Sequence, residues 1–261
     1  MQCAASGVPP LPEGEAAFFL DIDGTLLEIA DTPSAVRVDR QLLALVQRIH
    51  EAAGGAVALI SGRRIADIDG LFPGLRLPLA GQHGIERRDA AGGLHIHPAP
   101  LAELARLRQH FDDIVAAHPG LLLEDKGATL ALHYRRAPQA EEEVLRAMTG
   151  ILKRLGEGFR IQPGKMVFEI KPAGKDKGTA IAEFMDEEPF RGRTPVFLGD
   201  DVTDEYGFHV VNAQGGSSIK VGAGHTVANW RLPDVAAVRA WLARCLMRLA
   251  PSSAFLEGND E

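Results

Sequence analysis

Cysteine and long apolar runs are both scarce in this 261-residue chain. Only Cys3 and Cys245 are present, and Cys3 lies in a segment that we expect to be a loose tail. A stapling disulfide is therefore not expected, and a reducing compartment fits. The longest apolar runs, such as 16–20 and 56–60, have five residues, far below the roughly 20 that cross a bilayer. Residues 1–14 lack the basic start and apolar stretch of a signal peptide. We expect a cytoplasmic protein that does not bind a membrane.

Positive charge is not in excess either. Lys plus Arg number 28 against 35 Asp plus Glu, a net charge of −7 at pH 7, which argues against nucleic acid as a partner. Hydrophobic residues make up 46% and charged residues 24% of the chain, as in a folded globular protein. The sequence has no repeat, no Walker loop and no G-x-S-x-G elbow. Gly222-Ala223-Gly224 is only half a dinucleotide fingerprint, and His95 with His97 lacks further metal ligands nearby.

The two ends of the chain predict an α/β core. Residues 16–20, 57–60 and 195–198 are short apolar runs typical of strands buried on both faces. Residues 39–53 have apolar positions at helical spacing and stop at two glycines. The three strands end at Asp21, Ser61 and Asp200, and parallel sheets bind ligands at the carboxyl ends of their strands. These three residues therefore mark a candidate site.

The middle of the chain predicts a second unit. Helices over 101–117 and 140–155 each precede a pair of strands, 121–124 with 129–135 and 160–162 with 166–171, the second pair turning at Pro163-Gly164. We expect an inserted α+β cap over 101–172, a Rossmann-like parallel-sheet core over 15–100 and 173–250, and tails over 1–14 and 251–261.

Side chains on the predicted cap strands alternate between two faces. Leu130, Leu132 and Tyr134 share one face, and Thr129, His133 and Arg135 share the other. The apolar face should pack on the two helices and leave a polar face open. Because the cap segment is nearly neutral and the rest of the chain is acidic, we expect a metal in the core and a polar substrate between the two units.

Asp21 and Asp23 are the sharpest chemical signal. They follow a buried strand two residues apart, in Asp21-Ile22-Asp23-Gly24-Thr25, so both carboxylates point to one side of an extended segment. A carboxylate can form an aspartyl-phosphate, which would make Asp21 a nucleophile and Asp23 a general acid and base. The alternative is a simple Asx turn.

Carboxylates also crowd the end of the strand over 195–198. In Gly199-Asp200-Asp201-Val202-Thr203-Asp204-Glu205 they would repel one another without a cation, and oxygen ligands favour Mg²⁺. The alternative is an N-cap with an acidic first helical turn. Lys177 could neutralise a phosphoryl oxygen and Ser61 could donate to one, although Lys175 is close enough to take the place of Lys177.

These motifs, in this order, resemble the haloacid-dehalogenase-like (HAD) phosphatase superfamily. The matching residues are DIDGT at 21–25, Ser61, Lys177 and GDDVTDE at 199–205. The trehalose-6-phosphate phosphatase family is a closer resemblance. It is carried by ISGR at 60–63, GQHG at 81–84, LEDKGATLALHYR at 123–135, FEIKP at 168–172 and DKGTA at 176–180.

The resemblance implies a HAD core with an αββαββ cap and a role for each matching residue. Asp21 attacks phosphorus, and Asp23 protonates the leaving sugar oxygen and then activates water. Ser61 and Lys177 bind the phosphoryl group. Asp21, the Asp23 carbonyl and Asp200 hold Mg²⁺, with Asp201 close by and Asp204 behind them. The positions implied for the sugar are Arg63, Gln82, His83, Glu124, Lys126, His133, Arg135 and Glu169.

The expected activity is Mg²⁺-dependent hydrolysis of trehalose 6-phosphate, with trehalose-6-phosphate synthase as a pathway partner. Three alternatives stay open at this stage. One is a phosphatase for another sugar phosphate, such as sucrose 6-phosphate or a mannosyl phosphate. The second is a phosphomutase, and the third is a non-catalytic sugar-phosphate sensor.

Overall fold

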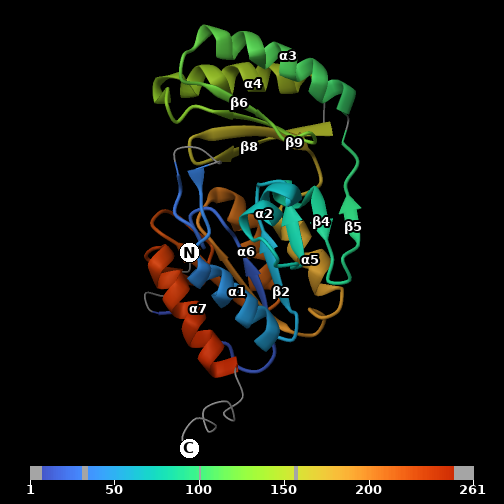
Figure 1. Cartoon of the computed structure of the whole chain (residues 1–261). Helices are drawn as coiled ribbons and strands as arrows, with labels where there is room; N and C mark the ends of the chain where they lie inside the picture. Colours follow the sequence, from blue (N-terminus) through green and yellow to red (C-terminus); the bar gives the residue numbers. More distant parts are fainter. Residues whose placement is uncertain (1–7, 31–34, 100, 156–157, 250–261) are drawn as a thin grey trace, which may run out of the picture.

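The structure is a computed structural model that describes residues 8–30, 35–99, 101–155 and 158–249. It has a core and a cap, stacked one above the other (Figure 1). The elements of the core are β1 (Ala16–Leu20), α1 (Arg40–Ala52), β2 (Val57–Ile60), α2 (Ile65–Leu71), β3 (Leu79–Gly81), a 3₁₀ turn (Gln82–Gly84), β4 (Glu86–Arg88), β5 (Leu94–Ile96), α5 (Lys177–Met185), β10 (Thr194–Gly199), a 3₁₀ turn (Val202–Asp204), α6 (Glu205–Ala213), β11 (Ser217–Val221), β12 (Trp230–Leu232) and α7 (Val235–Leu249).

The core sheet has eight strands in the order β12-β11-β10-β1-β2-β3-β4-β5. The strands from β12 to β3 are parallel, whereas β4 and β5 add an antiparallel hairpin at one edge. Strand β5 over Leu94–Ile96 is the outer strand of this hairpin. The predicted α/β fold class is confirmed by this sheet together with the separate antiparallel cap.

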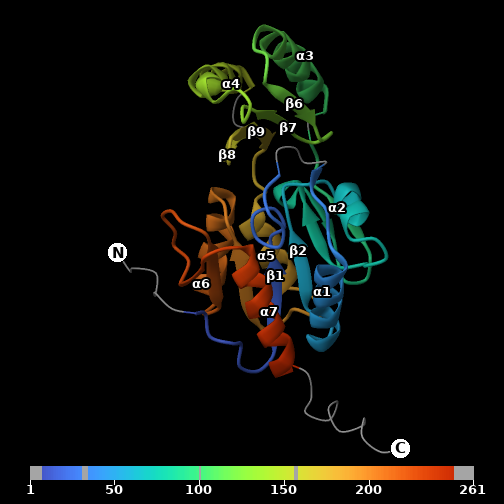
Figure 2. The same cartoon turned by 60° about the vertical axis from the view of Figure 1, so that its left-hand side comes forward.

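Helices cover both faces of the core sheet (Figure 2). On β1, Phe18 and Leu20 pack with residues of α1, α2 and α7, while Ala17 and Phe19 pack with residues of α5 and α6. This two-sided burial explains why β1 is apolar at every position. Helix α1 begins after Asp39, whose carboxylate accepts a 2.8 Å hydrogen bond from the Leu42 amide.

The cap forms a second layered unit above the carboxyl edge of the core sheet (Figures 1 and 2). Its elements are α3 (Leu101–Ala117), β6 (Leu122–Asp125), β7 (Leu130–His133), a 3₁₀ turn (Pro138–Ala140), α4 (Glu141–Leu155), β8 (Phe159–Gly164) and β9 (Val167–Pro172). The four strands are antiparallel, in the order β6-β7-β9-β8. Strand β8 continues through Gly164, so the hairpin turns at Lys165-Met166 and not at Pro163-Gly164 as expected.

The two faces of the cap sheet differ as the alternation predicts. Leu130, Leu132 and Tyr134 join a buried cluster with α3 and α4 residues such as Phe111 and Met148. The opposite face looks toward the core, where His133 lines the pocket described below.

The tails lie largely outside the described residues, which include neither Cys3 nor the C-terminal tail after residue 250. Residues 8–14 depart from the expectation of a loose tail, because Pro9 is buried and its carbonyl accepts a 2.9 Å hydrogen bond from the Trp241 indole. Cys245 is a free, buried thiol on α7. No helix in the described part of the chain is long and apolar enough to cross a bilayer.

Candidate active site

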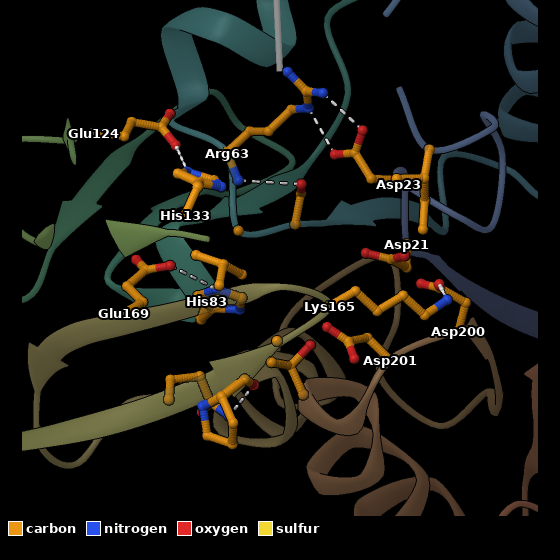
Figure 3. Close-up of a pocket in the computed structure, with 18 of the residues that line it drawn as sticks. Asp21, Asp23, Arg63, His83, Glu124, His133, Lys165, Glu169, Asp200 and Asp201 are labelled. Atoms are coloured by element: carbon orange, nitrogen blue, oxygen red, sulfur yellow. Dashed lines mark hydrogen bonds and ion pairs between the residues drawn. The ribbon is translucent and has the colours of Figure 1, made fainter. Parts of the chain in front are cut away.

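The candidate site lies where β10, β1 and β2 end side by side. These three strands are neighbours in the sheet, so the residues that follow them meet at one edge. A pocket separates this edge from the polar face of the cap (Figure 3). Thirteen of the residues proposed from the sequence line it, whereas Gln82 and Asp204 do not: Asp21, Asp23, Ser61, Arg63, His83, Glu124, Lys126, His133, Arg135, Glu169, Lys177, Asp200 and Asp201.

Three carboxylates cluster at the core side of the pocket. Oxygens of Asp21, Asp200 and Asp204 all lie within 4.8 Å of one another. Lys177, at the start of α5, donates to Asp21 Oδ1 at 2.8 Å and to Asp204 Oδ1 at 2.6 Å. The Thr25 hydroxyl donates to Asp21 Oδ2 at 3.0 Å. The cluster is buried, which makes the repulsion among its charges strong.

Glycine at position 24 allows this close approach. Gly24 has φ +84°, and a Cβ added there would lie 2.1 Å from Asp200 Oδ2. A side chain at this position would therefore collide with the carboxylate and would also adopt a strained backbone conformation. The glycine of the Asp21–Thr25 motif thus has a steric role at the junction of the two acidic loops.

Burial and mutual repulsion dominate the electrostatics of the carboxylate cluster. Burial raises the pKa of Asp21 well above its ordinary value. The nearby Lys177 ammonium lowers this pKa, and the negative charges of Asp204 and Asp200 raise it further. Burial likewise raises the pKa of Asp200. Lys177 lies between two carboxylates, whose attraction outweighs burial and raises its pKa. A cation beside Asp21 and Asp200 would reverse the upward shifts.

Asp201 and Asp204 follow Asp200 closely in the sequence but have different partners. Asp204 is fully buried and is a member of the carboxylate cluster. Its Oδ2 also accepts hydrogen bonds from the amides of Asp200 at 3.0 Å and Asp201 at 2.9 Å. Asp201 lines the pocket, but its Oδ1 caps the following turn by accepting from the Val202 amide at 2.8 Å. The N-cap alternative therefore describes Asp201, and the cluster is completed by Asp204.

Asp23 points away from the cluster and toward Arg63. Its carboxylate accepts two hydrogen bonds from the Arg63 guanidinium, at 2.6 and 2.7 Å. The Arg63 amide donates to Ser61 Oγ at 3.2 Å. Arg63 therefore links the candidate proton-transfer group with the candidate phosphoryl-binding hydroxyl, whereas the sequence predicted only a contact with sugar.

The polar face of the cap brings two pairs of predicted sugar-binding residues over the pocket (Figure 3). His133 Nε2 and Glu124 Oε2 lie 2.8 Å apart. Lys126 donates to Glu169 Oε2 at 3.0 Å and to the Gly62 carbonyl of the core at 3.0 Å. The last contact ties the cap to the loop that follows β2.

Glu169 is ionised although it is buried. Burial raises the pKa of Glu169, but Lys126 and His83 attract the carboxylate more strongly and hold its pKa well below the ordinary value. His83 Nε2 lies 3.3 Å from Glu169 Oε2. Burial lowers the pKa of His83 despite this neighbour. Glu169 Oε1 and His83 Nδ1 are buried without a hydrogen-bond partner. The ionised carboxylate oxygen can accept a hydrogen bond from a ligand, and the ring nitrogen can accept or donate one according to its tautomer.

The turn over Gln82–Gly84 has an uncommon backbone. Gln82 and His83 have φ values of +47° and +56°, a strained conformation for residues with side chains. It brings the His83 ring against Gly62, where an added Cβ would lie 2.6 Å from His83 Nε2. Gln82 itself is buried behind the pocket, and its Oε1 accepts a 3.4 Å hydrogen bond from Thr129. This position does not suit the predicted contact of Gln82 with a substrate.

The structure also separates the two candidate lysines and adds residues that the sequence did not indicate. Lys177 reaches Asp21, whereas the Lys175 ammonium pairs with Glu183 on α5. Thr25, Gln162 and Lys165 take part in the site without having been proposed. Thr25 could have been found, because it completes the Asp21–Thr25 motif. Lys165 belongs to no motif that indicated a functional role in the sequence.

Comparison with known proteins identifies relatives over most of the chain. The sequence profile of the family described as trehalose-phosphatase matches residues 19–236. Trehalose-6-phosphate phosphatase of Escherichia coli (strain K12) is 49% identical over 226 residues, which cover 87% of this chain and 85% of that protein. The family resemblance seen in the sequence is confirmed by both findings.

Solved structures agree on the fold. A trehalose-6-phosphate phosphatase related protein superposes with a TM-score of 0.75 at 26% identity, covering 89% of this chain and 97% of that one. A phosphatase of the haloalkanoate (HAD) enzyme superfamily from Bacteroides thetaiotaomicron has a TM-score of 0.62 at 17% identity, covering 94% and 100%. The second likeness concerns the fold alone. With a family profile that spans most of its length and a close bacterial relative, the chain belongs to the trehalose-phosphatase family.

Proposed function

We propose that this chain hydrolyses trehalose 6-phosphate to trehalose and phosphate and that it requires Mg²⁺. The observation that carries the proposal is the position of Asp21, which is buried beside Lys177 and two further carboxylates at the floor of a pocket with a polar roof. The E. coli relative with 49% identity is named for this activity.

The donor set fits a hard divalent cation. All three clustered side chains are carboxylates, whose oxygens favour a hard cation. Burial raises the pKa of Asp21 and of Asp200, and a bound cation would oppose these shifts. Asp21 and Asp200 would hold the cation with the Asp23 carbonyl, and Asp204 or Asp201 would support them. When bound, Mg²⁺ neutralises charge on the phosphoryl group and on the attacking carboxylate.

The residues of the core then have separate tasks in the proposed reaction. Asp21 attacks phosphorus and forms an aspartyl-phosphate, while the bond from phosphorus to the sugar oxygen breaks. Asp23 acts first in its protonated form and gives that proton to the sugar oxygen. The carboxylate that remains later takes a proton from the water that attacks the aspartyl-phosphate. Ser61 and Lys177 hold the phosphoryl oxygens, which gain negative charge as the reaction proceeds.

The cap over 101–172 would bind the sugar and exclude water. Glu124, Lys126 and Glu169 would hydrogen-bond sugar hydroxyls. Their position in the pocket lining and the unpartnered atoms of Glu169 and His83 support this. Arg63, His133 and Arg135 line the same space. We further propose that the chain works in the cytoplasm, on the product of a trehalose-6-phosphate synthase.

Phosphate release from a panel of sugar phosphates tests the proposal. Trehalose 6-phosphate should be hydrolysed far faster than glucose 6-phosphate or sucrose 6-phosphate, with Mg²⁺ and not with EDTA. The Asp21→Asn variant is a matched control, because it keeps the size of the side chain and removes the nucleophile. Faster release from another sugar phosphate would keep the chemistry and overturn the sugar assignment. No release from any of them by the folded, Mg²⁺-supplemented chain would favour a sensor.

A further inference from the structure

Lys165 lies at the tip of the hairpin that joins β8 to β9. We define residues 164–166 as the hairpin tip. Met166 has φ +62°, which turns the chain sharply at this point. The Arg135 guanidinium donates to the Lys165 carbonyl at 3.1 Å, and this contact fixes the backbone of the turn while leaving the Lys165 side chain to extend toward the core.

The Lys165 ammonium contacts the Asp200 carboxylate of the core (Figure 3). The Asp200 side chain is 3% exposed, whereas the Lys165 side chain is 47% exposed. Among the described residues, Lys165 is the one whose side chain hydrogen-bonds the Asp200 carboxylate. The hairpin tip also lies close to Asp201, since a Cβ added to Gly164 would be 3.2 Å from Asp201 Oδ2.

The charges of the cluster explain why a cap lysine takes this place. Lys177 forms ion pairs with Asp21 and Asp204. Another cation can therefore pair with Asp200. A divalent cation held by Asp21 and Asp200 would supply that charge from inside the cluster. It would also repel the Lys165 ammonium, because two cations within a few ångströms of one buried carboxylate interact unfavourably.

We propose that Lys165 and the divalent cation compete for Asp200. Without the cation, the lysine neutralises Asp200 and holds the hairpin tip on the core. With the cation bound, Lys165 leaves Asp200 and the hairpin tip is released from this contact. Occupancy of the cation site is thereby coupled to the position of the cap. The inference rests on the proposed cation site and does not depend on which sugar is bound.

Calorimetric titration of the substrate-free full chain with Mg²⁺ tests the competition. The Lys165→Gln variant should bind Mg²⁺ about 3- to 10-fold more tightly than the wild type, as expected when a cation no longer has to break a half-exposed ion pair. Lys153→Gln is the matched control. It removes the same charge from the same unit, at an exposed position on α4, and should leave the affinity unchanged.

A structural readout accompanies the titration. Met166 belongs to the hairpin tip, so its methyl group, labelled with ¹³C and assigned with Met166→Leu, reports on the tip by NMR. Mg²⁺ should shift this signal in the wild type and have much less effect in Lys165→Gln, where the ion pair is already absent. The Met148 methyl, buried in the cap between α4 and the sheet, serves as an internal reference.

The outcomes separate this inference from the proposed function. Equal or weaker Mg²⁺ binding by Lys165→Gln would overturn the competition while leaving the cation site intact, as would a Met166 signal that responds identically in both chains. Absence of Mg²⁺ binding in both chains would overturn the cation site and the inference with it. Tighter binding by Lys165→Gln would support the competition even if trehalose 6-phosphate proved not to be the substrate.

Discussion

The Arg63 guanidinium and the Asp23 carboxylate form a bidentate ion pair, with Nε to Oδ2 at 2.6 Å and Nη2 to Oδ1 at 2.7 Å. This geometry holds both oxygens of Asp23 in one orientation. A group that transfers protons depends on such orientation, because small displacements from the reacting atoms are costly. In the proposed reaction, Arg63 would therefore position Asp23, in addition to any contact with the substrate.

Replacement of Arg63 tests that role. We expect Arg63→Gln to lower kcat by about 10- to 100-fold, because Asp23 loses its orientation. Arg63→Lys should recover only part of the loss, since an ammonium cannot form the two parallel bonds. Phosphate release in the presence of Mg²⁺ measures both. The neighbouring Arg64, which pairs with Asp67 on the surface, provides the control Arg64→Gln, for which no change is expected. Wild-type turnover by Arg63→Gln would refute the assignment.

The two lysines before α5 should behave very differently. Lys177→Met removes the ammonium between Asp21 and Asp204, and we expect a loss of about 10²- to 10³-fold in kcat, as for other groups that stabilise developing charge. Lys175→Met affects only the pair with Glu183 and should stay within about twofold of the wild type. Circular dichroism checks that both variants fold. A larger kinetic defect in Lys175→Met than in Lys177→Met would reverse the assignment.

Gly24 offers a steric test of the junction between the two acidic loops. In Gly24→Ala the new Cβ would meet Asp200 Oδ2 at 2.1 Å, and the positive φ adds about 1–2 kcal/mol of backbone strain. We expect weaker Mg²⁺ binding and a loss of turnover, because Asp200 has to move. Gly174→Ala is a control with a comparable positive φ and open space around the Cβ, and it should retain Mg²⁺ affinity. Equal Mg²⁺ affinities for the two variants would show that the contact with Asp200 is unimportant.

Glu169 provides a prediction about pH. Its pKa is depressed in the folded chain because Lys126 and His83 outweigh the effect of burial. The ionised carboxylate thus stabilises the folded state above its unfolded pKa of about 4.5, and this contribution falls as the pH is lowered toward the folded value. Glu169→Gln should lower stability at pH 7 by about 3 kcal/mol, because the Lys126 side chain, which is only 10% exposed, loses its counter-charge.

Urea unfolding of the wild type and Glu169→Gln at pH 7, 5.5 and 3.5 measures the effect. The difference between the two midpoints should narrow below about pH 4.5, the ordinary value for the group. Glu103→Gln, on the cap helix α3, controls for loss of a cap carboxylate elsewhere. A difference that stays constant down to pH 3.5 would contradict the depressed pKa.

Much of the architecture could be predicted, because it follows from local patterns of apolar and polar residues in the sequence. The apolar run of β1 required burial on both faces, and the alternation of Leu130 and Leu132 with His133 assigned the two faces of the cap sheet. Asp21, Ser61 and Asp200 could be assigned to one site, because each follows a buried strand and parallel sheets bind ligands at the carboxyl ends of their strands. Strand β5 was harder to predict from the sequence. Leu94 and Ile96 are both exposed, so this segment lacks the buried apolar pattern of a strand in the sheet interior.

Side-chain partners across the interface between core and cap could not be predicted in the same way. Whether Asp201 or Asp204 joins the carboxylate cluster depends on which one caps the turn, and both are acceptable N-terminal residues. Gln82 sits in a matching motif, yet a positive φ turns it behind the pocket. Lys165 reaches Asp200 only because a hairpin of the cap descends onto the core. A pattern along the chain does not encode such a contact.

The insertion of the cap also fixes an order of synthesis. Strand β1 pairs with β10 from Ala16 with Thr194 to Leu20 with Leu198, and residues 101–172 are translated between these two strands. The local hairpins of the cap can form on the ribosome while one side of β1 still awaits its partner. Asp21 meets Asp200 and Asp204 only after β10 has been made. The cap can therefore fold first, and the acidic cluster, whose charges repel, is assembled in the last stage of chain growth.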